Sequence, residues 1–177
     1  VHNSVLCQLV SLSKAKDDFE NLKKYLDEQK SILEDYIRKN PTMEEAFQDP
    51  LIFNELYYAY YYLEMNQPHS AFEHLQKGAK YLTPHTYFMY RVLYYDAYAL
   101  YYRRCKEYDK ALSQLDSTIV LLQEAFSSDY VNQLSAKADI LVEAGRSQEA
   151  LPIYEKVLQM KDSLVTELSD KQMKLIQ

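Results

Sequence analysis

The sequence predicts an all-α chain built as a stack of antiparallel helix pairs, and two observations support this prediction. First, only two of the 177 residues are Gly and five are Pro, which is too few for the many tight turns of an all-β fold. Second, pairs of alanines recur along the chain with a nearly constant spacing. A chain of this length can bury one sizeable core, so we expect a single domain over residues 1–177.

The recurring feature is two alanines that stand twelve residues apart. It occurs three times at intervals of 40 and 39 residues, at Ala59 and Ala71, Ala99 and Ala111, and Ala138 and Ala150. A short polar stretch separates the two alanines of each pair. Helices that cross closely need a small side chain at the contact, and alanine supplies it without weakening either helix. We therefore interpret each alanine pair as the crossing of two helices, and successive pairs as repeats that share a continuous core.

The segment from Ala138 to Tyr154, with Gly145 at its turn, resembles the turn and second helix of the tetratricopeptide repeat family. Three further positions resemble the family's aromatic, aromatic and small residues, namely Tyr102, Tyr108 and Ala111. In the other two repeats, Asn66 and Lys106 stand where the family has glycine. The resemblance covers about residues 51–160 and implies a right-handed superhelical stack, an α-solenoid, that binds other molecules. Fold alone does not fix what is bound.

About eight helices are expected. Their approximate ranges are 4–15, 17–38, 50–65, 68–81, 85–104, 107–126, 129–144 and 147–177. The repeats then cover residues 51–81, 85–126 and 129–160, followed by an exit helix over 161–177.

Residues 1–40 are expected to form an N-terminal helix pair that is either a divergent repeat or a cap. Stepping back forty residues from the first alanine pair gives Phe19 and Ser31 rather than two alanines. Asp17 is the expected cap of the second helix. Residues 40–50 are expected to be a loop, with Asp49 and Pro50 at the start of the next helix.

The last helix shows no stop signal and carries a narrow apolar seam of Val157, Met160, Leu164, Leu168 and Leu175. Such a seam is typical of a helix that pairs with another helix. It predicts an exit helix through which two copies could form a homodimer, and the alternative is a frayed tail.

No catalytic or metal-binding pattern is present. The four histidines lack metal-ligand spacing and are expected on the solvated surface, and Gly78 and Gly145 cannot form a phosphate loop. We therefore expect no enzyme activity in this fragment, no cofactor and no metal. A net charge of −6 argues against nucleic acid as a partner. Cys7 and Cys105 are expected to be buried thiols, with a disulfide as the alternative.

Stacking of the repeats predicts a binding groove lined by the residues three before, one after and four after the first alanine of each repeat. These are Leu56, Tyr60, Leu63, Asp96, Leu100, Arg103, Ser135, Asp139 and Val142. Tyrosine suits binding surfaces because it offers a rigid ring and a hydroxyl. We expect a protein, a peptide or a small ligand in this groove. Asp96 and Asp139 would repel the peptide carboxylate that chaperone-binding members of the family hold, so that function is disfavoured.

The segment from Tyr154 to Gln172 carries a second resemblance through Met160-Lys161-Asp162-Ser163-Leu164. It is similar to the end of the tetratricopeptide sensor region of bacterial two-component histidine kinases and related membrane-anchored regulators. This resemblance implies an extracytoplasmic (periplasmic) input domain for signal transduction. Any membrane contact and any histidine kinase module would then lie in segments outside this fragment. The alternative is a stand-alone cytoplasmic scaffold that assembles protein partners.

Overall fold

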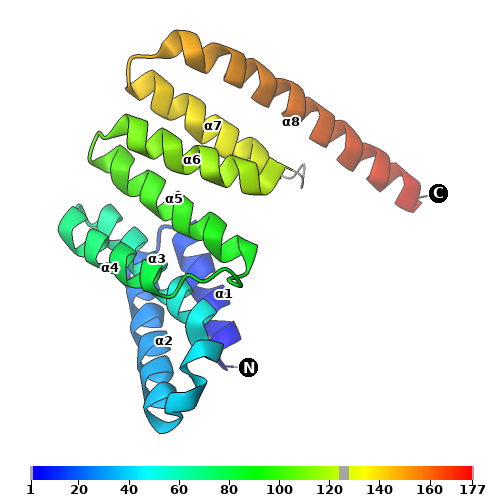
Figure 1. Ribbon diagram of the computed structural model, residues 1–177. Coiled ribbons are helices and arrows are strands. Elements are labelled where there is room, and N and C mark those ends of the chain that lie inside the picture. Colours follow the sequence, from blue (N-terminus) through cyan, green and yellow to red (C-terminus); the bar gives the residue numbers. More distant parts are fainter. Residues whose placement is uncertain (1, 124–127, 177) are drawn as a thin grey trace. The chain divides into compact units, whose positions relative to one another are not determined.

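The structure is a computed structural model that describes residues 2–123 and 128–176. In these ranges it contains eight α-helices, one 3₁₀ helix and no strand (Figure 1). The elements are α1 (His2–Ala15), α2 (Phe19–Lys39), η1 (Pro41–Phe47), α3 (Gln48–Glu64), α4 (Pro68–Lys80), α5 (Phe88–Arg104), α6 (Tyr108–Leu122), α7 (Ser128–Glu143) and α8 (Ser147–Ile176). The prediction of an all-α chain is confirmed. Residues 124–126, at the end of the sixth predicted helix, lie outside the described residues.

The chain divides into two compact units, Val1–Cys105 and Lys106–Gln177, and each is described by itself. This boundary falls inside the predicted repeat 85–126, so that α5 belongs to unit 1 and α6 to unit 2. The single domain over residues 1–177 remains a prediction.

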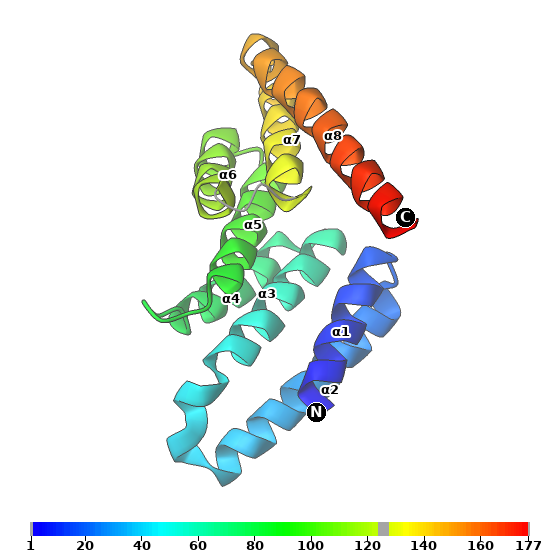
Figure 2. The ribbon, with the colours of Figure 1, turned by 90° about the vertical axis from the view of Figure 1, so that its right-hand side faces the viewer.

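Unit 1 contains two helix pairs and one further helix. The first pair is α1 with α2 and the second is α3 with α4, while α5 packs on both α3 and α4 (Figure 2). The first helices of the pairs are also neighbours, since α3 contacts both α1 and α5. Around α3, the buried side chains of Ile52, Leu56, Ala59 and Leu75 form one core cluster with Ala97 of α5. This pattern of contacts between neighbouring helices fits a helical repeat.

In unit 2, α7 packs against both α6 and α8. The 30-residue α8 is almost twice as long as the 16-residue α7, and its C-terminal part runs on past the end of α7 (Figures 1 and 2). Where the two helices lie together, α8 contributes the buried side chains of Ala150, Val157 and Met160.

All six alanines of the repeated pattern are buried, with 0–3% of each residue exposed. This is the burial that a close helix crossing requires. Gly78 marks a similar approach within unit 1, because a Cβ atom at this position would lie 3.1 Å from Cδ2 of Leu56.

One turn geometry recurs between paired helices. Its marker is a residue in the left-handed region, and the four such residues in the described chain are Asp17 (φ 54°), Asn66 (φ 56°), Lys106 (φ 60°) and Gly145 (φ 76°). In three of the turns the next backbone N–H donates to the carbonyl oxygen five residues earlier. These bonds run from Asp18 to Ser13 (2.9 Å), from Gln67 to Tyr62 (2.8 Å) and from Arg146 to Leu141 (2.8 Å). They form the Schellman motif that ends many helices.

These four residues align the helix pairs, and we call this alignment the turn register. It places Val10 and Leu22 of the N-terminal pair at the positions of the two alanines, and both are fully buried. At the offset of forty residues used in the sequence analysis, by contrast, Phe19 is half-buried and Ser31 is exposed. The N-terminal offset is 49 residues rather than 40, because the long α2 and the inserted η1 lengthen the first repeat.

Two further predictions about the N-terminal pair need correction. Asp18, not Asp17, caps α2, because its carboxylate accepts a hydrogen bond from the backbone N–H of Asn21 (3.1 Å). The region expected to be a loop contains η1, and the Phe47 ring at the end of η1 packs on Tyr36 with the ring centres 4.6 Å apart. The predicted start of the next helix is correct, since Asp49 lies in the first turn of α3.

Candidate binding site

Four of the predicted groove residues line one pocket in unit 1. They are Leu56 and Tyr60 of α3 and Asp96 and Leu100 of α5, and Lys14 of α1 joins them. The remaining lining residues are Tyr57, Leu93 and Ala97. The four predicted residues converge because they are spaced by four along each helix, which places each pair on one helix face, and because α3 and α5 are in contact.

The pocket is small, with a volume of about 60 Å³. Pockets for drug-sized ligands measure about 300–1,000 Å³. Its walls are mainly aliphatic and aromatic, through Leu56, Leu93, Leu100 and Tyr57. A cavity of this size and composition can seat part of one apolar side chain, but it cannot enclose a metabolite.

Lys14 is the polar centre of this pocket. Its ammonium nitrogen lies 4.4 Å from the centre of the Tyr60 ring and 5.4 Å from that of Tyr57, which are cation–π distances. Burial lowers the pKa of Lys14, while the carboxylates of Asp96 and Glu64 act in the opposite direction. The charge of Lys14 is therefore held between two aromatic rings and balanced by acids of the same unit.

Polar contacts tie the edge of the pocket together. Glu64 of α3 accepts hydrogen bonds from Arg104 of α5 at 2.9 and 3.1 Å, and the hydroxyl groups of Ser11 and Tyr57 lie 3.3 Å apart. Burial raises the pKa values of Tyr57 and Tyr60. Both phenols therefore remain protonated at neutral pH and can donate hydrogen bonds to a ligand.

The other predicted groove residues lie elsewhere. Leu63 is buried in unit 1 and does not line the pocket, and Arg103 is half-buried near the end of α5. Ser135, Asp139 and Val142 belong to α7 of unit 2. Of these, Asp139 accepts a hydrogen bond from the hydroxyl of Tyr154 at 2.5 Å.

Lys14 was missed by the sequence analysis. It stands four residues after Val10, as Leu63, Arg103 and Val142 stand four residues after the first alanines. The turn register thus gives it the same groove position. The sequence signal that could have identified Lys14 is the polar stretch around Asp17, which marks the turn between α1 and α2. The alanine pattern did not reveal it, because Val10 stands where the other repeats have their first alanine.

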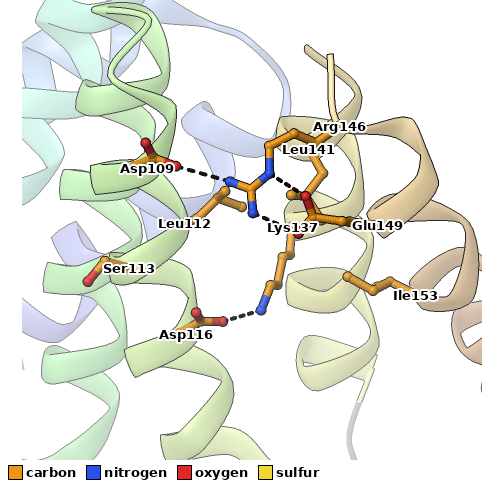
Figure 3. Close-up of a pocket in the computed structure, with 9 residues that line it drawn as sticks. All are labelled: Asp109, Leu112, Ser113, Asp116, Lys137, Leu141, Arg146, Glu149 and Ile153. Atoms are coloured by element: carbon orange, nitrogen blue, oxygen red, sulfur yellow. Dashed lines mark hydrogen bonds and ion pairs between the residues drawn. The ribbon is translucent and has the colours of Figure 1, made fainter. Parts of the chain in front are cut away.

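Unit 2 contains a larger, more open pocket of about 410 Å³ (Figure 3). It is lined by Asp109, Leu112, Ser113, Asp116, Lys137, Leu141, Arg146, Glu149 and Ile153. Figure 3 shows the Arg146 side chain between two acids, donating to Glu149 (2.7 Å for each of two bonds) and to Asp109 (3.0 Å). Lys137 pairs with Asp116 at 2.5 Å. Because both cations are already paired with acids, this pocket offers little attraction for an anionic ligand.

His74 corrects the expectation that the histidines lie on the solvated surface. It is buried in unit 1, where its Nδ1 atom lies 2.6 Å from Oε2 of Glu55. Its ring also stacks on Tyr58 and Tyr62, with centre distances of 4.8 and 5.2 Å. These contacts hold α4 against α3, so His74 has a packing role.

Across the described chain, no group of three or more His, Cys, Asp or Glu residues is arranged to hold a metal ion. Cys7 and Cys105 are both half-buried free thiols, and Cys7 Sγ accepts a hydrogen bond from the Gln29 amide at 3.1 Å. None of the helices in the described ranges is both long enough and apolar enough to cross a membrane.

Comparisons with protein-family models, with curated proteins and with solved structures give no match.

Proposed function

We propose that this chain is a non-catalytic binding module of the tetratricopeptide type, that is, a right-handed superhelical stack of helix pairs. It would hold a protein or peptide segment against the first helices of the pairs, α1, α3 and α5. The observation that carries the proposal is the pocket of unit 1. Four residues chosen from the repeat spacing alone line it together with Lys14. Surfaces that bind proteins are enriched in tyrosine, and this pocket has two.

The pocket chemistry favours an extended peptide that carries an apolar side chain. The aliphatic walls would receive that side chain, while the Lys14 ammonium and the Tyr60 hydroxyl would bind backbone carbonyl oxygens beside it. A free peptide carboxylate is disfavoured, because Asp96 and Glu64 already balance the charge of Lys14. The small volume favours a peptide over an enclosed small ligand.

Selection from a displayed library of random twelve-residue peptides tests this proposal with the whole chain as bait. We expect enriched peptides that share an apolar residue, and binding that falls at least tenfold on Tyr60→Ala and on Leu100→Asp. The matched control is Val120→Asp, because Val120 is exposed on α6 and lies in unit 2. Absence of enriched peptides, or binding that both pocket variants leave unchanged, would refute the proposal.

We further propose that the module is the input region of a bacterial membrane-bound signal-transduction protein. The length of α8, which runs past α7, supports this proposal, because a ligand that prefers one arrangement of the helices could shift the exit helix. The alternative is a stand-alone scaffold for protein assembly. The coding sequence after Gln177 discriminates between them. About twenty apolar residues followed by a kinase or DNA-binding module would favour the sensor, and a stop codon would favour the scaffold.

A further inference from the structure

Two helices of the chain carry bare apolar stripes. On α8 the stripe consists of Leu151, Leu158 and Val165, whose exposed fractions are 59%, 63% and 67%. On α1 it consists of Val5 and Leu12, with 49% and 50% exposed. In both stripes the residues are seven apart, which is close to two helical turns and therefore places them on one face. The terminal repeats of soluble repeat proteins usually have polar outer faces. Exposed apolar stripes on the first and last helices therefore indicate that a partner covers them.

The turn register shows how the same positions are used inside unit 1. Leu151 and Leu158 of α8 correspond to Phe72 and Ala79 of α4, with the offset of 79 residues that separates Asn66 from Gly145. The Phe72 ring stacks on the Tyr101 ring of α5 with a centre distance of 5.2 Å. This contact joins the second helix of one pair to the helix that follows it.

The α1 stripe corresponds to the other side of that contact. Leu12 and Val5 of α1 align with Tyr101 and Tyr94 of α5, with the offset of 89 residues that separates Asp17 from Lys106. Tyr94 and Tyr101 both pack against the core cluster around α3 and α4. The exposed residue Leu151 thus matches Phe72, and the exposed residue Leu12 matches its partner Tyr101.

We propose that α8 of one copy packs its stripe against α1 of a second copy, so that chains associate head to tail. The contact would repeat the α4–α5 junction between two molecules. It joins two different surfaces, so a pair of chains linked by one such contact leaves one stripe free at each end. Further copies can add there, and the contact builds a closed ring or an open row of copies rather than a dimer joined through identical surfaces.

The charges beside the two stripes are compatible with this contact. Glu155, Lys161 and Asp162 are exposed and stand three or four residues from the stripe residues of α8, on the same side of the helix. Residues 1–16 contain no acid and two lysines, Lys14 and Lys16. An α8–α1 contact therefore brings no acid of α1 toward the two acids of α8.

Complementation between two blocked variants of the full chain tests the proposal. One variant carries Val5→Glu and Leu12→Glu, which blocks the α1 stripe, and the other carries Leu151→Glu and Leu158→Glu, which blocks the α8 stripe. In sedimentation velocity we expect the wild type to form species larger than the monomer as its concentration rises, and each variant alone to stay monomeric. An equimolar mixture should form a complex of two chains and nothing larger, because each variant retains the stripe that the other lacks.

Val120→Glu is the matched control, because it places the same charge at an exposed valine on α6 and should associate as the wild type does. Far-UV circular dichroism checks that every variant is folded. A monomeric wild type at all concentrations would overturn the proposal. So would dimerisation of the variant with the blocked α1 stripe, since that result would assign the contact to two α8 helices.

Discussion

At the residue scale, four different residues produce the same turn. Gly145 adopts the left-handed conformation without steric cost, whereas Asp17, Asn66 and Lys106 adopt it with a side chain. For residues with a Cβ atom this conformation costs about 1–2 kcal/mol, with the lower values for Asn and Asp, whose side chains can hydrogen-bond locally. Lys106 has no such compensation, so it holds the most strained of the four turns.

Reciprocal substitutions measure this strain. Lys106→Gly should raise the free energy of unfolding by about 1 kcal/mol, and Gly145→Ala should lower it by about 1–2 kcal/mol. Apart from its chain neighbours, no heavy atom lies within 4 Å of the place that a Cβ atom on residue 145 would take, so the effect of this substitution would come from the backbone conformation alone. Urea denaturation followed by circular dichroism gives both values. A stabilising Gly145→Ala would show that this turn is not left-handed in solution.

At the element scale, the alanine spacing was sufficient to predict most of the helices and four residues of the unit 1 pocket. It could not predict the first repeat correctly, because Val10 and Leu22 are large and the inserted η1 changes the period. Nor could it predict the burial of His74, whose partner Glu55 lies 19 residues away on another helix. The chain division at Cys105 was equally hidden, because the repeat pattern continues across it.

The crossing of α3 and α4 can be tested at Ala71, which is fully buried. Ala71→Leu should lower the free energy of unfolding by about 1–3 kcal/mol, because three extra carbon atoms must fit into a packed crossing. Gln76→Leu on the exposed face of the same helix is the matched control and should change stability by less than about 0.5 kcal/mol. Equal effects in urea denaturation would mean that Ala71 does not lie at a close contact.

At the scale of the whole molecule, the two apolar stripes link stability to concentration. Head-to-tail association binds folded chains only, so it stabilises them by mass action, by about 1.4 kcal/mol when the concentration of free partner reaches ten times the dissociation constant. For a chain of this length that corresponds to an increase in Tm of about 3–6 °C. The Tm of the wild type should therefore rise with protein concentration, whereas the Tm of Leu151→Glu/Leu158→Glu should stay constant. Differential scanning calorimetry over a hundredfold range of protein concentration measures both Tm values. If the stripes did not join separate chains, neither protein would show a concentration-dependent Tm.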